Sequence, residues 1–216
     1  MRKLIFLIFL FVTYINLYSQ EKVAPDNPFK FNIGLGTGIG LYGGKSNAQN
    51  TTDTNFIDAA CLIVRLQADY SFIKRFALGF SIERNGFFTS RDSSEKANSY
   101  NFGIKAKYKF ICKDFNIMYV EILPAYSVFS YQYGNASYNQ FSSVRSKGFN
   151  FQTGLGWDHY FNLHLGMNLG AYYTIYRYNK IINIKDGQVV TVNNPPENLT
   201  LRFGGLNINL GLLYRF

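Results

Sequence analysis

Eight stretches of this chain alternate between apolar residues and polar residues or glycine, and this alternation constrains the fold more than any other feature. A period of two residues places one kind of side chain on each face of an extended strand. The first stretch runs from Phe29 to Leu41 and carries glycine at four successive positions of its polar face. The other seven cover residues 62–70, 76–83, 100–110, 118–128, 149–158, 163–175 and 205–216. The sequence therefore predicts eight strands, each with one apolar face.

The links between these segments alternate in length. Short turns lie around residues 72–74, 112–114 and 161–162, whereas the other links run to roughly fifteen to thirty residues, which is long for a compact domain. An even number of strands joined in this way predicts an antiparallel structure with one trimmed end and one loopy end. Both ends of the strand series should lie on the trimmed side.

The first twenty residues have the pattern of a secretory signal. Arg2 and Lys3 precede an apolar run over residues 4–12, and the small residue Ser19 marks a cleavage point after residue 19 or 20. The apolar run is short of the ~20 residues that a transmembrane helix needs. We therefore expect residues 1–19 to be a signal peptide and the rest of the chain to be exported.

The apolar faces of the strands could point into a soluble core or out into lipid. Charged residues on the polar face, such as Arg65 and Glu83, suit a wet exterior as well as a polar lumen, and soluble sandwiches and barrels also alternate. The export signal, the strand lengths and the glycines favour the outward orientation. A sheet in hydrocarbon must close so that every backbone group is paired, and ~9–11 residues per strand are enough to cross. The predicted fold class is all-β, an eight-stranded antiparallel up-and-down transmembrane β-barrel.

The chain ends on an apolar series in one phase with a final aromatic residue, formed by Leu210, Leu212, Tyr214 and Phe216. Together with the eight segments, this ending resembles the OmpA/OmpX-like family of small outer-membrane β-barrel proteins, a group that also includes PorT-like barrels. The resemblance covers nearly the whole exported chain. It implies a bacterial outer-membrane location, a short periplasmic segment over residues 20–28 and a barrel domain over 29–216. It also implies that the ending is an assembly signal, read by the barrel-assembly machinery, and that the last strand closes against the first.

An eight-stranded barrel has room inside only for side chains. A turn centred on residue 74 would place Arg65 opposite Glu83, and a turn centred on residue 113 would place Lys105 opposite Glu121. These four residues are predicted to form a buried ionic network that plugs the lumen. A proton or ion path along the same groups is the competing interpretation.

Catalytic and metal chemistry have weak support in the sequence. The two histidines, His159 and His164, flank a short turn at the trimmed end, whereas similarity to lipid A-modifying barrel enzymes would require a His and a Ser near the outer leaflet. Asp158 beside these histidines suits a metal site, but a polar turn explains the three residues equally well. We expect no enzymatic activity, no cofactor and no metal. Cys61 and Cys112 should lie near opposite ends of the barrel, too far apart for a disulfide.

The charge balance bears on the partners. Without the signal peptide, 20 basic residues face 13 acidic ones, down from 22 in the full sequence. For an exported chain, this excess favours anionic headgroups of outer-membrane lipid and lipopolysaccharide over nucleic acid. The loop-end cations that would meet lipid phosphates are Lys45, Arg91, Lys96, Arg145, Lys147, Arg177, Lys180 and Lys185. A hairpin over residues 181–192, with Asp186-Gly187 at its turn, is a candidate edge for a surface protein partner.

These patterns favour a monomeric barrel with a structural or surface-interaction, adhesion-like role and a side-chain-plugged lumen. Three alternatives stay open at this point: a component of a secretion or motility assembly, a narrow channel, and a lipid A-modifying barrel enzyme.

Overall fold

The computed structural model describes residues 31–46, 56–88, 96–113, 115–132, 143–185, 188–190 and 201–216. The predicted signal peptide over 1–19 and the segment over 20–28 lie outside these residues and stay predictions. The strands are β1 Phe31–Ser46, β2 Phe56–Ile73, β3 Phe76–Phe87, β4 Lys96–Lys113, β5 Asn116–Gln132, β6 Ser143–Tyr160, β7 Leu165–Lys185, β8 Gln188–Val190 and β9 Leu201–Arg215.

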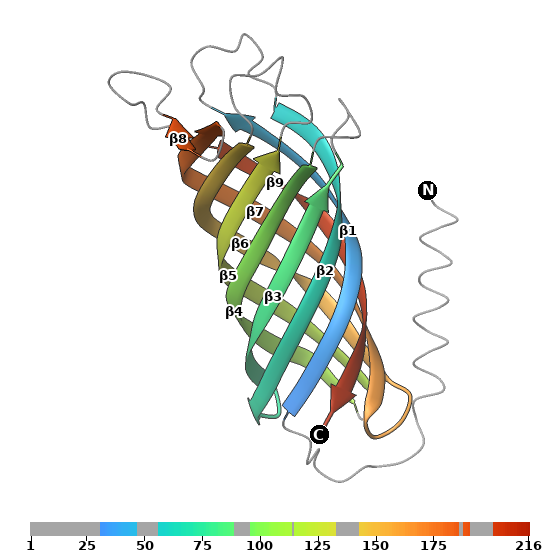
Figure 1. Cartoon of the computed structure of the whole chain (residues 1–216). Helices are drawn as coiled ribbons and strands as arrows, with labels where there is room; N and C mark the ends of the chain where they lie inside the picture. Colours follow the sequence, from blue (N-terminus) through green and yellow to red (C-terminus); the bar gives the residue numbers. More distant parts are fainter. Residues whose placement is uncertain are drawn as a thin grey trace, which may run out of the picture.

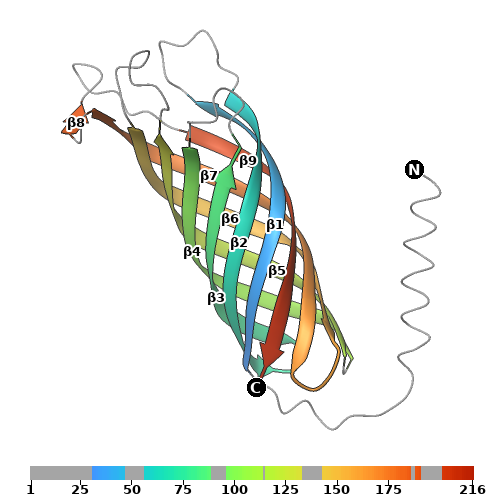
Figure 2. The ribbon, with the colours of Figure 1, turned by 45° about the vertical axis from the view of Figure 1, so that its right-hand side comes forward.

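Eight of these strands close into one antiparallel barrel, as Figures 1 and 2 show from two sides. Each strand pairs with its neighbour in the chain from β1 to β7, and β9 completes the ring between β7 and β1. The closing seam runs from Asn32 opposite Arg215 to Ser46 opposite Leu201. The predicted fold class and the predicted closure of the last strand against the first are confirmed.

Within the described ranges, the chain has no helix that is long and apolar enough to cross a membrane.

The apolar faces point out of the barrel and the polar faces point in. Ile39, Ile104 and Leu206 are 65–69% exposed, whereas Arg65 and Glu121 are at most 4% exposed. Since each strand alternates, a single choice of orientation turns all of its apolar side chains outward. The structure confirms the outward orientation predicted from the sequence.

The two ends of the barrel differ as the link lengths predict. At the turn end, β2 and β3 join through Lys74 and Arg75, β4 and β5 pair up to Lys113 opposite Asn116, and residues 161–164 connect β6 to β7. The other strand ends meet at the opposite, loop end (Figure 1). Nine residues separate β1 from β2, eight separate β3 from β4 and ten separate β5 from β6, so the predicted lengths of fifteen to thirty residues are wrong for these links, because the strands extend further than the alternating segments indicated. At the loop end, the predicted hairpin is present as β8, which pairs with the last three residues of β7. Its turn and the prolines after it lie outside the described residues.

The register between β4 and β5 differs from the prediction. Glu121 lies opposite Lys107, so the predicted placement of Lys105 opposite Glu121 is wrong. Lys113 pairs with Asn116 at the turn, which alone would shift the partner of Glu121 by three positions, and an irregularity between Lys109 and Ile111 takes one of these back. In an antiparallel pair, this displacement moves each partner by two positions and keeps both side chains on the lumen face.

The glycines of β1 leave a flat inner wall over which long side chains from other positions lie. A Cβ on Gly34 would sit 2.6 Å from Leu213 Cδ2, and one on Gly40 would sit 2.5 Å from Tyr42 Cε2. A Cβ on Gly38 would overlap the Asn209 side chain and the Ile208 carbonyl oxygen. Side chains from β9 and β1 itself therefore fill the space that these glycines leave in the lumen.

Candidate functional site

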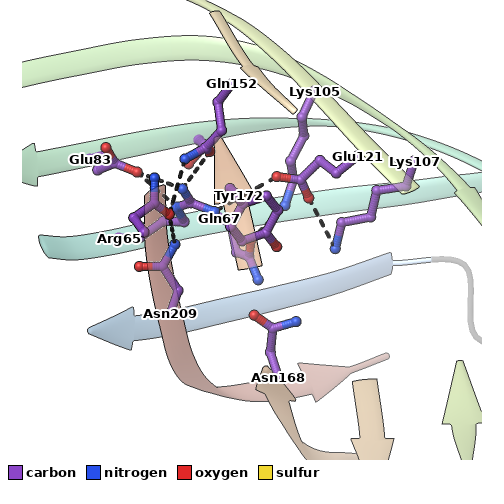
Figure 3. Close-up of polar contacts among 12 residues, drawn as sticks. Arg65, Gln67, Glu83, Lys105, Lys107, Glu121, Gln152, Asn168, Tyr172 and Asn209 are labelled. Carbon is purple, nitrogen blue, oxygen red and sulfur yellow. Dashed lines mark hydrogen bonds and ion pairs between the residues drawn. The ribbon is translucent and has the colours of Figure 1, made fainter. Parts of the chain in front are cut away.

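The middle of the lumen holds six charged side chains, which we call the ionic belt: Arg65, Asp69, Glu83, Lys105, Lys107 and Glu121. They form one chain of alternating sign that crosses four strands. Figure 3 labels all of them except Asp69. Arg65 Nη2 lies 2.6 Å from Glu83 Oε2, and Arg65 Nη1 lies 3.7 Å from Glu121 Oε1. Lys107 Nζ lies 3.8 Å from Glu121 Oε2 and 2.9 Å from Asp69 Oδ2. The chain ends at Lys105, whose Nζ lies 2.8 Å from Asp69 Oδ1. With three cations and three acids, the belt is neutral as a unit.

Glu121 joins two tighter groups within the belt. Both of its links are longer than those of the other acids, and neither of its carboxylate oxygens has a hydrogen-bond partner within the described residues. It is nevertheless only 1% exposed. A buried carboxylate in this position is held by the opposite charges on either side of it rather than by hydrogen bonds.

Arg65 ties the belt to the opposite wall of the lumen. Its Nη2 donates to Glu83 Oε2 at 2.6 Å and to Gln152 Oε1 at 2.5 Å, so β2, β3 and β6 are tied across the lumen. Its guanidinium also lies 4.9 Å from the centroid of the Tyr172 ring. Charge-assisted bonds of this kind are the strong ones in a dry interior.

Towards the loop end, the lumen is filled by an aromatic layer: Tyr42, Phe87, Phe129, Tyr176, Tyr178 and Phe203. Phe203 contacts all five other rings, with centroid distances from 4.5 Å to Tyr176 up to 6.2 Å to Phe129. The rings come from β1, β3, β5, β7 and β9, which means that the layer spans the whole cross-section. It defines the hydrophobic centre of the loop half of the barrel.

Hydrogen bonds connect the aromatic layer to the ionic belt. Asn101 Nδ2 donates to Glu83 Oε1 at 3.1 Å and to the Tyr176 hydroxyl at 3.4 Å. Asn85 Nδ2 donates to the same hydroxyl at 2.6 Å. The two layers are thus held as one unit.

A smaller cluster fills the turn end, formed by Ile117, Tyr119, Tyr160 and Leu213. The Arg215 guanidinium lies 3.9 Å from the centroid of the Tyr160 ring and adds to this cluster. Leu213 interrupts the polar face of the last strand in the sequence, and its burial in this cluster explains the interruption. The lumen is therefore occupied at three levels along its length.

The histidines have structural contacts at the turn end. His159 Nδ1 lies 2.9 Å from Asn116 Oδ1, and His164 Nδ1 lies 2.9 Å from the Arg215 carbonyl oxygen. Asp158 accepts a bond from Asn168 instead of facing the histidines. Within the described ranges, no three His, Cys, Asp or Glu side chains form a metal-binding group. Cys61 and Cys112 are both free, as predicted.

Sequence reasoning placed Arg65 opposite Glu83 correctly but missed other members of the belt. Asp69 binds both Lys105 and Lys107, and Gln152 binds Arg65 from the far side of the ring. The sequence shows that Asp69 and Gln152 lie on the polar faces of their strands. It does not show which side chains they meet across the lumen, because the register of neighbouring strands does not set those contacts. The four residues of the predicted assembly signal lie on the outer face, each at least 44% exposed.

A closed barrel with an apolar outer wall and a lumen filled by charged and aromatic side chains belongs to the class of bacterial outer-membrane β-barrels. Solved outer-membrane proteins share the fold. OprG from Pseudomonas aeruginosa is 14% identical, with a TM-score of 0.54 over 90% of this chain and 99% of that one. AlkL, solved in lipid bilayers, is 13% identical, with a TM-score of 0.54 over 91% and 94%. Neisserial surface protein A is 16% identical, with a TM-score of 0.50 over 86% and 97%.

A comparison of the sequence with known protein families identifies the family of this chain. The family described as "Protein of unknown function (DUF3575)" matches residues 34–214, and the chain belongs to it. No curated protein matches the sequence.

Proposed function

We propose that this protein is a monomeric, non-conducting outer-membrane barrel without enzymatic activity, which serves envelope structure or surface interaction through its loop end. The observation that supports this role most directly is the filled lumen. An ion or solute would have to displace the aromatic layer, then the neutral ionic belt, then the turn-end cluster. Because Asn101 bonds both Glu83 of the belt and Tyr176 of the aromatic layer, displacing one disturbs the other.

Energetics favour a static plug over a path. Removing one partner from a buried charge pair costs about 3–5 kcal/mol, since the other charge stays desolvated. A path through the belt would incur such a cost at several contacts in turn. The alternating order of signs suits mutual neutralisation, which supports a structural role for the belt.

The loop end offers an edge for another chain. Among the described strands, β8 pairs only with β7, so no other described strand covers its second side. An exposed strand edge accepts an added strand from a partner. This edge supports the surface-interaction part of the proposal, whether the partner is an adhesion target or a subunit of a secretion or motility assembly.

Planar-bilayer conductance tests the sealed lumen. The folded wild-type protein is expected to give no discrete current steps, and Phe203→Ala is expected to stay silent because the ionic belt still blocks the lumen. Leu206→Ala, on the outer face of the same strand, is the matched control for reconstitution. Regular single-channel steps from the wild type would reject the proposal in favour of a narrow channel.

Mass spectrometry of lipid A tests the absence of enzymatic activity. Lipid A from cells with and without the protein is expected to have the same mass profile. A loss or gain of one acyl chain that depends on the protein would instead establish a lipid-modifying enzyme.

A further inference from the structure

Among the charged side chains whose burial the structure describes, every exposed one is positive. Its acidic side chains of known placement, Asp69, Glu83, Glu121 and Asp158, are buried in the lumen. The exposed charged side chains are cations, and at the loop end they are Arg84, Lys96, Arg145, Lys147, Arg177 and Arg202. The described side chains at the outer rim therefore carry only positive charge, and the four lumen acids do not neutralise them at short range.

Two of these cations lie directly opposite each other. Arg177 on β7 pairs with Arg202 on β9, and both side chains are exposed on the outer face. Like charges opposite each other destabilise a strand pair, and within the described ranges neither arginine has an ion-pair partner. On the other side of Arg177, strand β6 places Phe149 opposite it. The next outward-facing residue of β6 towards the loop end is the exposed Lys147. Two guanidinium groups and an ammonium group thus share one face.

This cationic face stands at the border of the apolar wall. Ile175 is the next outward-facing residue from Arg177 towards the turn end, and its side chain is half exposed. Gly204 occupies the equivalent position next to Arg202 and lies opposite Ile175. A charge near the interface costs only about 0–1 kcal/mol, against about 2–4 kcal/mol at the bilayer midplane. The border of the apolar wall is therefore a place where the outer face can hold two charges next to lipid headgroups at low cost.

Gly204 leaves space that a hydroxyl group occupies. A Cβ at this position would lie 3.2 Å from the Tyr173 hydroxyl, which places that hydroxyl one outward position below Arg202. A larger residue would meet the Tyr173 ring in this place. The face thus combines cations above, a phenol hydroxyl beneath them and apolar side chains below both.

We propose that the Arg177–Arg202 pair binds a phosphate group of a phosphorylated glycolipid in the outer leaflet. Guanidinium groups bind phosphate oxygens in a forked, charge-assisted geometry, and one phosphate relieves the repulsion between the two arginines. Lys147 adds positive charge at the side of this site, and the apolar wall below it contacts the acyl chains. A lipid is the source because the site opens onto the membrane and not onto the lumen. The proposal is independent of whether the lumen conducts.

Native mass spectrometry of the folded protein in detergent tests this site, with bisphosphorylated lipid A as the probe. The double variant R177Q/R202Q is expected to retain lipid A at least about tenfold more weakly than the wild type, as expected for loss of charged hydrogen bonds. The matched control K74Q/R75Q removes the same charge from the turn end and is expected to bind like the wild type. Unheated gel migration confirms that each variant is folded, as expected for changes at exposed positions.

Two further probes distinguish the source of the phosphate. Chemically dephosphorylated lipid A is expected to lose the difference between the wild type and R177Q/R202Q, and inorganic phosphate is expected not to compete at millimolar concentration. Equal lipid A retention by the wild type and R177Q/R202Q would overturn the proposal. So would equal loss in K74Q/R75Q, which would show that net charge and not the paired site is responsible, or full competition by inorganic phosphate, which would show a free-anion site.

Discussion

Replacing Arg65 with methionine is the sharpest test of the ionic belt. Methionine fills similar volume without charge, so the substitution removes the contacts to Glu83 at 2.6 Å, to Glu121 at 3.7 Å and to Gln152 at 2.5 Å. The belt then holds two cations and three acids. Glu83 loses its only ion-pair partner in the belt, and Glu121 loses one of its two. Each of these carboxylates is at most 3% exposed and cannot turn to water.

The expected cost is large because the remaining charges stay buried. Breaking a buried pair by removing one partner costs about 3–5 kcal/mol. The double variant Arg65→Met/Glu83→Gln restores neutrality with two cations and two acids. It is expected to recover at least about half of the loss, since the stranded charge is removed together with its partner.

Equilibrium unfolding in lipid vesicles measures both free energies. Trp157 is the single tryptophan of the chain and reports the transition by its fluorescence. Arg84→Met is the matched control, because Arg84 is exposed on the outer face and lies 5.8 Å from the Tyr100 ring centroid, a contact worth at most about 1 kcal/mol at such a site. The reasoning is refuted if Arg65→Met costs no more than Arg84→Met, or if the double variant is less stable than Arg65→Met alone.

Two further predictions concern packing and assembly. Gly38→Val is expected to destabilise the barrel by about 1–3 kcal/mol through overpacking, because its side chain would overlap Asn209 and a backbone carbonyl; Ile39→Val, which faces lipid, is the control, and equal unfolding free energies for the two variants would contradict this. Phe216→Ser is expected to lower the yield of folded barrel in membrane fractions without changing the conductance or the unfolding free energy of the protein that does fold. Wild-type yields for Phe216→Ser would mean that the terminal aromatic is not part of an assembly signal.

Much of the fold follows from the sequence because its cause is local. Alternation fixes which residues share a face, and a bilayer presents the same solvent to every strand, so Ile39, Ile104 and Leu206 all turn outward. Link lengths then order the strands and separate the two ends. The pairing of Arg65 with Glu83 is also local, since only a tight turn separates their strands.

The contents of the lumen follow from contacts that the sequence does not order. The position of Glu121 depends on where one turn begins and on an irregularity beside it, and neither changes the alternation. Phe203 and Tyr42 meet although 161 positions of sequence separate them. Such contacts depend on the diameter and stagger of the closed ring, which the pattern of a single strand does not carry.

The distribution of charge connects the lumen to the outer rim. Each buried acid of the belt needs a cation beside it, so Arg65, Lys105 and Lys107 are used inside the barrel. The chain still has a basic excess, with 22 basic and 13 acidic residues in all, and the described part of the outer face has cations at its rim with no described acid beside them. Neutralising the inside therefore does not neutralise the outside. If the headgroup layer supplies the missing anions, then removing lipid phosphates should weaken retention at Arg177 and Arg202 while leaving the stability contributed by Arg65 unchanged. Lumen and rim would then be two electrostatic systems, separated by the wall of the barrel and open to independent mutation.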